Sequence, residues 1–440
     1  MGVKGLDEIR ITGGRPLWGT ITIQGSKNAA LPMMAAALLH RGLSVLENCP
    51  AISDVFCMEE ILRSLGAKTW WEGHCLFLDC TDAEGTEIRA ESTGRMRSSV
   101  ILLGPLLARN KKASVGYPGG CVIGKRPVDQ HLMVLRQLGA VIEERETGLH
   151  AFCTQRKGRH ITFGKRSVGA TEQGILAAVT AEGETVLHNC AEEPEILWLC
   201  RFLRTMGADI QREGAACLRI RGVRKLTGGK MQIPSDRIVT GTYICAAAAT
   251  RGRIVIENPP GGELDAFLRV YRKMGGQYTW NSGKLIADGR KVCIPVPFLE
   301  TDVYPGFPTD LQSPLMSVLT TVPGESHIRE NIFEDRFHLA EELNRMGAAV
   351  SVCGRDAWIS GGRHLRGCRV RASELRGGAA LLIAALAAEG ETIVEGCSFI
   401  RRGYEHICED LTALGGQAEE KTGTLFYENI KIQKKATDYR

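Results

Sequence analysis

The sequence predicts an α/β fold of two domains, each an inside-out α/β barrel made of three repeats of about 70 residues, with buried helices and outer sheets. Three observations support this fold: the length of the chain, a helix ending that recurs six times, and alanine-rich helices that are apolar nearly all round. A chain of 440 residues exceeds what one hydrophobic core usually serves, so two domains are expected.

The recurring helix ending consists of Leu-Gly or Met-Gly followed by Ala or Gly. Its glycines are Gly66, Gly139, Gly207, Gly275, Gly347 and Gly415, and successive ones are 68 to 73 residues apart. A glycine in this place suits a left-handed helix cap. The sequence after each glycine alternates as a strand does, so each repeat is expected to hold two helices and three or four strands.

The alanine-rich segments predict where the helices lie in each domain. Residues 243–250 and 377–388 are apolar nearly all round, and such helices are buried in water-soluble proteins. We prefer two closed three-repeat domains to an open array, because nothing resembles a polar capping repeat. The predicted domains are 27–234, carrying the Cys121 loop, and 1–26 plus 235–440, carrying Asp310 and Arg402, with the active-site cleft between them.

Composition excludes several classes of partner. Lys plus Arg number 55 against 50 for Asp plus Glu, and aromatic residues make up only 6%, so the mild positive charge suits small anions better than nucleic acid. The longest apolar runs are too short to span a bilayer, and the N-terminus has no apolar export segment. The 15 cysteines include no Cys-x-x-Cys pair. We therefore expect a cytoplasmic protein with reduced thiols and with neither nucleic acid nor membrane as a partner.

Several lysine and arginine residues lie at corners of the predicted fold, where a strand ends and the next helix begins. Lys27 follows a Gly-Ser turn at a helix start, where free backbone N–H groups and a positive charge would hold a phosphate or carboxylate. Taken alone, a lysine in this position is more often a solvated charge. The arginines at similar corners are Arg97, Arg126, Arg336, Arg376 and Arg402. Converging guanidinium groups would bind a small ligand with carboxylate and phosphate oxygens, whereas the alternative is pairing with local acids such as Glu334 or Glu405.

Two further residues have the character of an acid and a base. Cys121 lies in a glycine-rich loop beside Lys125 and Arg126, which favour the thiolate, while the glycines give access to it. Asp310 follows a Pro-Thr turn at a helix start, where a plain N-cap role is the simpler interpretation. With a substrate bound, the Asp310 carboxylate could take a proton from a sugar hydroxyl.

These motifs together resemble a known family. They are Gly25-Ser26-Lys27-Asn28, Met96-Arg97, the loop from Gly119 to Asp129, Phe307-Pro308-Thr309-Asp310 and Arg402-Gly403-Tyr404-Glu405. In order and spacing they resemble the UDP-N-acetylglucosamine 1-carboxyvinyltransferases of the EPSP synthase superfamily. The cysteine loop distinguishes this family from the 5-enolpyruvylshikimate-3-phosphate synthases, which share the fold.

The resemblance implies an enolpyruvyl (1-carboxyvinyl) transferase. Such an enzyme transfers the enolpyruvyl group of phosphoenolpyruvate to the 3-hydroxyl of UDP-N-acetylglucosamine and releases phosphate, in the first committed step of peptidoglycan synthesis. It implies no metal and no cofactor, and no His-Asp-Glu ligand set is apparent in the sequence.

The resemblance also implies roles for residues. The catalytic residues would be Cys121, Asp310, Lys27 and Arg402. Phosphoenolpyruvate would be held by Lys27, Asn28, Arg126 and Arg402. The UDP-sugar would be held by Arg97, Arg126, Pro127, Val128, Asp129, Gln130, Lys165, Arg166, Ser167, Val168, Asp310 and the backbone of Ile332, with Arg336 a further substrate-binding residue. Asp310 would be the base for the sugar hydroxyl, and Cys121 the general acid and the site of a phosphoenolpyruvate adduct and of fosfomycin alkylation.

The sequence departs from the family pattern at a few positions. Glu374 and Glu192 replace a usual Asp and Arg, and Arg166 and Glu172 are unusual in their segment. Two alternatives therefore stay open, which are transfer to another hydroxyl acceptor and a catalytically weak paralog that binds UDP-sugar as a regulator. Joint retention of the four catalytic residues disfavours the regulator, because a binding protein needs neither acid nor base.

Overall fold

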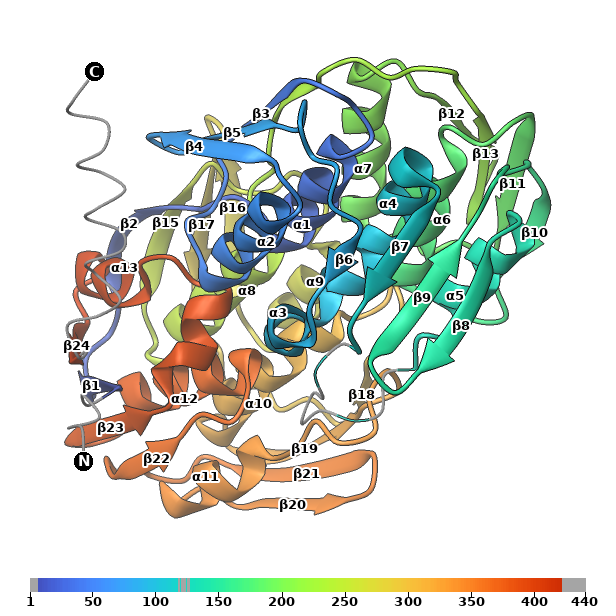
Figure 1. The fold of residues 1–440 in the computed structure, drawn as a ribbon. Helices are drawn as coiled ribbons and strands as arrows, with labels where there is room; N and C mark the ends of the chain where they lie inside the picture. Colours follow the sequence, from blue (N-terminus) through green and yellow to red (C-terminus); the bar gives the residue numbers. More distant parts are fainter. Residues whose placement is uncertain (1–6, 118, 120–123, 125–126, 422–440) are drawn as a thin grey trace. The chain divides into compact units, whose positions relative to one another are not determined.

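Six four-stranded sheets occur in the computed structural model, which describes residues 7–117, 119, 124 and 127–421 (Figure 1). Each sheet has the same pattern: a parallel pair at one edge, followed by two strands that pair antiparallel. Because the pattern recurs in all six, the sheets are copies of one structural repeat.

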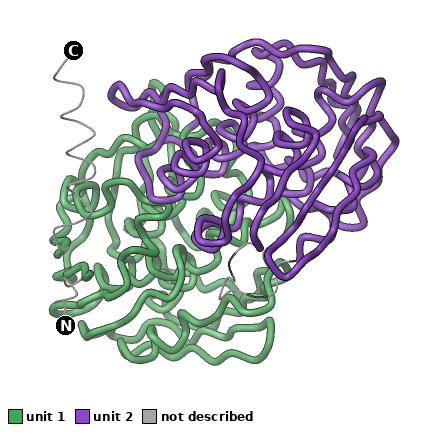
Figure 2. Tube along the Cα trace, in the orientation of Figure 1, with its two compact units in different colours: residues 1–24, 122–124, 235–440 green, residues 25–121, 125–234 purple. Residues whose placement is uncertain are grey.

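The chain divides into two compact units, coloured separately in Figure 2. Unit 2 comprises residues 25–121 and 125–234 and holds the sheets β14-β3-β5-β4, β6-β7-β9-β8 and β10-β11-β13-β12. Its strands are β3 (Leu43–Glu47), β4 (Lys68–Glu72), β5 (Cys75–Asp79), β6 (Glu87–Ile88), β7 (Lys112–Val115), β8 (Val141–Arg145), β9 (Gly148–Phe152), β10 (His160–Thr162), β11 (Glu184–His188), β12 (Asp209–Arg212), β13 (Cys217–Arg221) and β14 (Lys230–Gln232). Its helices are α1 (Lys27–Ala37), α2 (Ser53–Ser64), α3 (Ala90–Arg95), η1 (Arg97–Leu102), α4 (Leu103–Asn110), α5 (Asp129–Gln137), α6 (Val168–Ala178) and α7 (Pro194–Thr205).

Unit 1 comprises residues 1–24, 122–124 and 235–440 and holds the sheets β22-β23-β1-β24, β16-β17-β15-β2 and β18-β19-β21-β20. Its strands are β1 (Glu8–Thr12), β2 (Trp18–Thr22), β15 (Arg253–Glu257), β16 (Gln277–Asn281), β17 (Lys284–Asp288), β18 (Leu299–Glu300), β19 (Gly324–Arg329), β20 (Val350–Cys353), β21 (Asp356–Gly361), β22 (Arg369–Arg371), β23 (Glu391–Glu395) and β24 (Gln417–Lys421). Its helices are α8 (Arg237–Ala249), α9 (Asp265–Lys273), η2 (Thr309–Leu311), α10 (Gln312–Thr320), α11 (Leu339–Arg345), α12 (Leu375–Ala387), η3 (Cys397–Arg402) and α13 (Ile407–Ala413).

The alanine-rich helices form the centre of each unit. In unit 1, α8, α10 and α12 contact one another, and every residue of α8 and α10 is buried. In unit 2, α1, η1 with α4, and α6 occupy the corresponding place. Each unit has its own hydrophobic core. A helix that is apolar all round avoids water only when it is buried in the interior of the protein. The predicted arrangement of buried helices and outer sheets is therefore confirmed.

The six glycines of the repeated ending adopt the predicted left-handed conformation, with φ between 81° and 104°. In each case the glycine N–H bonds to the carbonyl three residues earlier, and the next residue's N–H bonds to the carbonyl five residues before it. At the end of α2, for example, Gly66 bonds to Arg63 and Ala67 bonds to Leu62. This is the Schellman motif, which ends the helix and directs the chain into the following strand.

The chain passes from unit 1 to unit 2 after Gln24 and returns after Pro234. Within unit 1, β2 pairs in parallel with β15, and the backbone N–H of Asp236 donates to the carbonyl of Gln24 at 3.0 Å. Within unit 2, β14 pairs in parallel with β3, and the N–H of Ser26 donates to the carbonyl of Pro234 at 2.7 Å. One strand beside each crossover therefore completes a sheet of its unit.

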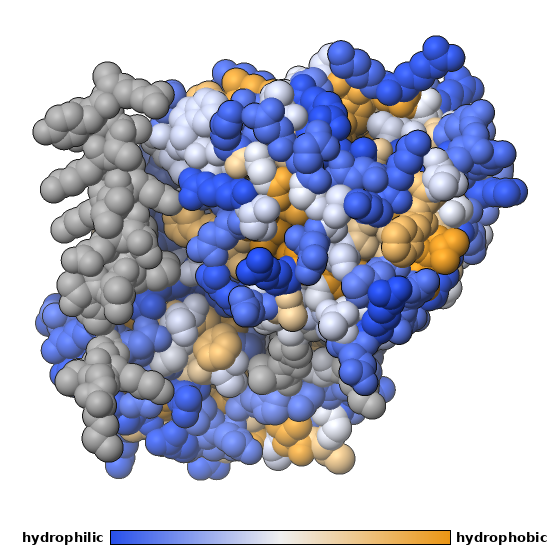
Figure 3. Space-filling model, viewed as in Figure 1, coloured by the Kyte–Doolittle hydropathy of each residue, from blue (hydrophilic) through white to orange (hydrophobic). Residues whose placement is uncertain are grey.

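The polar character of the surface agrees with the burial of the apolar helices inside each unit. On the face shown in Figure 3, hydrophilic residues predominate and apolar residues form small separate patches. Among the described residues, no helix is long and apolar enough to cross a membrane.

We expect alanine substitutions in unit 2 to destabilise it in a fixed order. At Gly207 (φ 95°) an added Cβ has no neighbour within 4 Å, so Gly207→Ala should cost about 1–2 kcal/mol from the backbone conformation alone. At Gly66 the Cβ would also lie 2.7 Å from the carbonyl oxygen of Asp82, so Gly66→Ala should cost more. Gly164→Ala, with open space and no positive φ, is the matched control. Denaturant unfolding that ranks all three alike would contradict this assignment.

Candidate functional site

The most distinctive polar group of unit 1 is a carboxylate held by two buried arginines. Arg336 donates to Oδ1 of Asp310 at 2.9 Å, and Arg376 donates to Oδ2 through Nη2 at 3.1 Å and Nε at 3.3 Å. The two arginine side chains are only 2% and 3% exposed, whereas Asp310 is 28% exposed. Asp310 therefore faces two fixed positive charges on one side and remains accessible on the other.

The positions of these residues follow from the short helix and the helix start that carry Asp310 and Arg376. Asp310 lies in η2, which runs directly into the central helix α10, and the N-cap residues of these two helices are Pro308 and Leu311. Arg376 is the second residue of the central helix α12, whose N-cap Glu374 accepts from the N–H groups of Arg376 and Gly377. The interpretation of Asp310 as a plain N-cap is wrong for the structure. Arg336 and Arg376 also pair with Asp310 rather than with an acid adjacent in sequence.

A second row of hydrogen bonds fixes Arg336. Its Nη1 donates to Oγ1 of Thr309 at 2.9 Å, and this hydroxyl donates to Oε2 of the buried Glu330 at 2.8 Å. The other oxygen of Glu330 accepts from the N–H groups of Ile332 at 2.8 Å and Phe333 at 3.1 Å. The Ile332 N–H, which lies in the predicted sugar-binding backbone, is thus bonded to Glu330.

Arg376 also connects to the turn that follows η3. Its Nη1 lies 3.4 Å from the hydroxyl of Tyr404, which is 2.8 Å from Oγ1 of Thr242 in α8. Burial opposes the charge of Arg376, but the neighbouring Asp310 carboxylate raises its pKa, so the guanidinium stays protonated. Arg402, a predicted catalytic residue, ends η3 and is partly buried two residues before Tyr404.

Unit 2 carries the predicted lysine and the predicted sugar-binding segments. Lys27 is the first residue of α1, and its Nζ lies 3.3 Å from Oδ2 of the buried Asp54 in α2. Because the Lys27 side chain is only 13% exposed, its interpretation as a solvated charge is wrong. Asn28 follows it in α1 and is partly buried.

The segments around Arg97, 127–130 and 165–168 meet within unit 2. Arg97 begins η1, with Nη2 3.5 Å from the carbonyl of Pro127. The Lys165 N–H lies 3.4 Å from Oε1 of the buried Gln130. Ser167 caps α6 through a bond from the Ala170 N–H, and Val168 is the first residue of that helix. Val128 precedes α5 and Asp129 begins it. Cys121 and Arg126 lie outside the described residues.

Two departures from the family pattern contact each other. Nη1 of Arg166 lies 2.9 Å from Oε1 of Glu192, and Nη2 of Arg212 lies 2.8 Å from the other oxygen. The glutamate is therefore balanced by two arginines. The unusual residue in the predicted sugar-binding segment and the unusual residue before α7 form one ion-pair group.

A third departure, Glu172, is buried in α6. Burial, and then the neighbouring carboxylates of Glu195 and Glu193, raise the pKa of Glu172 well above its ordinary value. Its carboxyl group consequently keeps a proton to higher pH than an exposed glutamate does.

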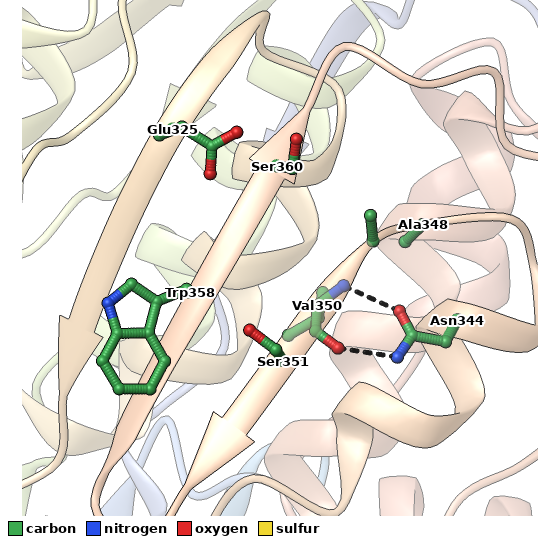
Figure 4. Close-up of a pocket in the computed structure, with 8 residues that line it drawn as sticks. Glu325, Asn344, Ala348, Val350, Ser351, Trp358 and Ser360 are labelled. Atoms are coloured by element: carbon green, nitrogen blue, oxygen red, sulfur yellow. Dashed lines mark hydrogen bonds between the residues drawn. The ribbon is translucent and has the colours of Figure 1, made fainter.

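A surface cavity of about 350 Å³ lies apart from these residues, on the sheet of β19, β20 and β21 (Figure 4). Trp358 and Ser351 line it, and Asn344 bonds to both backbone groups of Val350 at its side. Glu325, at the start of β19, marks its far edge, whereas Glu330 follows the end of that strand. The cavity is therefore at the opposite end of β19 from the Asp310 group.

Local sequence reasoning identified Asp310, Lys27 and the corner arginines, but it missed Tyr404 and Glu330 as their supports. Tyr404 belongs to the motif Arg402-Gly403-Tyr404-Glu405, in which no local signal marks it as a support for an arginine. The one available signal for Glu330 was an acid directly after a predicted strand, which is too common to single it out.

We expect the Arg166–Glu192 pair to be energetically coupled. A double-mutant cycle with Arg166→Ala and Glu192→Ala should give a coupling of about 0.5–1 kcal/mol that falls with added salt, because the pair is only partly buried. The exposed pair Arg145 and Glu143 serves as the matched control and should couple less. Additive effects of the two substitutions would show that the pairing contributes nothing.

Glu172→Gln should stabilise the protein at neutral and alkaline pH. Since the pKa of Glu172 is raised in the folded state, its contribution is fully present below the ordinary glutamate pKa and is lost as pH rises toward the folded value. The variant should therefore exceed wild type in denaturant midpoint at pH 8 and approach it at pH 4.5. The exposed Glu146→Gln is the control. A constant difference across this pH range would contradict the assignment.

Comparison with known proteins identifies the family. The family model described as EPSP synthase (3-phosphoshikimate 1-carboxyvinyltransferase) matches residues 11–411. The chain is 42% identical to UDP-N-acetylglucosamine 1-carboxyvinyltransferase 2 of Caldanaerobacter subterraneus subsp. tengcongensis, over 93% of this chain and 98% of that protein. It is 43% identical to UDP-N-acetylglucosamine 1-carboxyvinyltransferase 1 of Symbiobacterium thermophilum, over 94% and 95% of the two chains.

Solved structures show the same architecture. The enolpyruvyl transferase NikO from Streptomyces tendae superposes with a TM-score of 0.85 at 26% identity, covering 95% of this chain and all of that one. An EPSP synthase from Acinetobacter baumannii superposes with a TM-score of 0.69 at 18% identity, over 94% and 99% of the two chains, which supports the fold alone. The predicted fold and the predicted resemblance are confirmed, and the chain belongs to the EPSP synthase (3-phosphoshikimate 1-carboxyvinyltransferase) family.

Proposed function

We propose that the chain transfers the enolpyruvyl group of phosphoenolpyruvate to the 3-hydroxyl of UDP-N-acetylglucosamine with release of phosphate, as the first committed step of peptidoglycan synthesis. Relatives that share 42–43% of its residues over nearly the whole chain carry the name of this activity. The observation that carries the proposal is the accessible Asp310 carboxylate fixed by two buried arginines.

Asp310 is the proposed base. The sugar 3-hydroxyl adds to C2 of phosphoenolpyruvate, so the new O–C2 bond forms while the hydroxyl proton passes to Asp310 and C3 gains a proton. Two guanidinium groups hold the carboxylate in a fixed orientation, and a base must be positioned within hydrogen-bond reach of the hydroxyl whose proton it takes. Cys121 is the proposed acid that protonates C3.

Elimination completes the reaction. C3 of the tetrahedral intermediate returns a proton to the Cys121 thiolate, the bond between C2 and the phosphate oxygen breaks with its electron pair leaving on phosphate, and the C2–C3 double bond forms again. Lys27, Arg126 and Arg402 are the proposed partners of the phosphate and carboxylate groups, together with Asn28. Fixed cations of this kind stabilise the charge that develops on the leaving phosphate.

The proposed UDP-sugar contacts come from both units, and among the described residues of unit 2 the segments around Arg97, Pro127 and Lys165 meet. They are Arg97, Arg126, Pro127, Val128, Asp129, Gln130, Lys165, Arg166, Ser167 and Val168, together with Asp310, Ile332 and Arg336 in unit 1. Arg336 is already engaged by Asp310 and Thr309, so we propose that it acts by orienting Asp310.

One observation favours a second candidate with the same chemistry. Arg166 lies in the proposed sugar-binding segment and is held by Glu192, and both residues depart from the family pattern. A changed charge arrangement there would suit another hydroxyl acceptor. The transfer step and the roles of Asp310 and Cys121 would be the same.

We place the reaction in the cytoplasm. The cysteines among the described residues are all free thiols, as is usual in a reducing compartment. The substrates, phosphoenolpyruvate and UDP-N-acetylglucosamine, are small anions, which suits the mild positive charge of the chain.

Phosphate release from phosphoenolpyruvate tests the proposal. Release should depend on UDP-N-acetylglucosamine, and Asp310→Ala and Cys121→Ser should each lower kcat by about 10²–10⁴-fold, since each removes a proton-transfer group. The exposed Asp335→Asn in unit 1 is the matched control and should leave kcat within twofold.

Two results would contradict the proposal: phosphate release that ignores the UDP-sugar, or full activity in Asp310→Ala. Release that requires a different hydroxyl compound in place of the UDP-sugar would support the second candidate.

A further inference from the structure

The side-chain amide of Gln24 brackets the turn that follows η3. Its Nε2 donates to the carbonyl of Gly403 at 3.1 Å, and its Oε1 accepts from the backbone N–H of Glu405 at 2.8 Å. The two contacts lie on either side of Tyr404, immediately after Arg402. One side-chain amide thus both donates to and accepts from the backbone of this turn, as the backbone of a neighbouring strand would.

The backbone of Gln24 is fixed as well. Its carbonyl accepts from the N–H of Asp236 at 3.0 Å, and the Asp236 carboxylate caps α8 by accepting from Ile238 at 2.8 Å and Val239 at 3.0 Å. Gln24 is also the last residue of unit 1 before the chain crosses to unit 2. The amide is therefore presented from a backbone that is itself tied to a central helix.

Other contacts hold only the inner side of this turn. Tyr404 is buried and its hydroxyl reaches Thr242 at 2.8 Å, and a Cβ added to Gly403 would lie 2.8 Å from Cδ2 of Leu375. These contacts fix the inner side of the turn. The Gln24 amide fixes its backbone on either side of Tyr404, where a small rotation would displace Arg402.

We propose that Gln24 is a positioning residue that sets the location of Arg402, the group to which the proposed function assigns phosphoenolpyruvate; this inference rests on that function. Gln24 acts through the backbone of the turn and not by touching the substrate. A misplaced cation loses much of its stabilisation of a developing charge, because the effect depends on fixed geometry.

Two substitutions separate the hydrogen bonds from the bulk of the side chain. Gln24→Met keeps the length and removes both bonds, so kcat/KM for phosphoenolpyruvate should fall about tenfold, as expected for two hydrogen bonds, while KM for UDP-N-acetylglucosamine stays within twofold. Gln24→Glu keeps the oxygen that accepts from the Glu405 N–H. It replaces the amide N–H₂ that donates to the Gly403 carbonyl by a carboxylate oxygen, which cannot donate. Its activity relative to wild type should rise as the pH is lowered from 8 to 5.5, because the protonated carboxyl group can donate.

Thr22→Val is the matched control. Thr22 lies two residues earlier beside the same crossover and bonds to Glu257, away from the turn, so this variant should match wild type. The inference is overturned if Gln24→Met leaves both substrates unaffected, or if it weakens both equally.

Amide hydrogen exchange at Tyr404 and Glu405 gives a readout that needs no activity. Exchange there should be at least tenfold faster in Gln24→Met than in wild type and Thr22→Val. If the wild-type protein turns over no phosphoenolpyruvate, the proposed function fails, and exchange alone decides the positioning role. Unchanged exchange at both amides overturns it.

Discussion

The candidate site of unit 1 depends on one electrostatic constraint: a charge taken out of water must be paired. Arg336 and Arg376 are almost fully buried, and each uncompensated charge would cost several kcal/mol. Asp310 pairs with both, and the Asp236 carboxylate also favours the charged form of Arg376. Thr309 and Tyr404 accept hydrogen bonds from further N–H groups of these arginines, and Glu330 in turn accepts from Thr309, whereas Nε of Arg336 has no partner among the described residues. The rigidity of the proposed base thus follows from the cost of burying its partners.

The repeat architecture explains where the candidate residues lie. Several of them lie at the N-terminal ends of the central helices, namely Lys27 on α1, Arg97 on η1, Ser167 before α6, Asp310 on η2 and Arg376 on α12, whereas Arg402 ends η3. A helix N-terminus presents unpaired N–H groups and a partial positive charge. Burying the helices side by side gathers these ends in each unit, so a fold selected for packing apolar helices also concentrates groups suited to binding anions.

Much of the fold could be predicted from the sequence because its signals are local. Six glycines in helix caps and helices without a polar face specify the repeat and its inside-out packing. Lys27 and Asp310 could be found in the same way, from turns that precede helices. The pairing of Asp310 with Arg376, 66 residues later, could not, since periodicity carries no information on which distant segments meet. The same holds for Arg166 with Glu192 and for Gln24 with the turn after η3.

Unit 1 is built from both ends of the chain, and this affects the order in which parts of the protein can fold during synthesis. Strand β1 lies between β23 and β24, so its first residues wait for residues 391–421 before they can pair. Unit 2 is almost complete once Pro234 has left the ribosome. Domains generally fold as units and N-terminal ones first, and closing a long loop costs only slightly more entropy than closing a short one. A growing chain therefore carries a folded unit 2 and an unpaired N-terminal strand until the last repeat emerges.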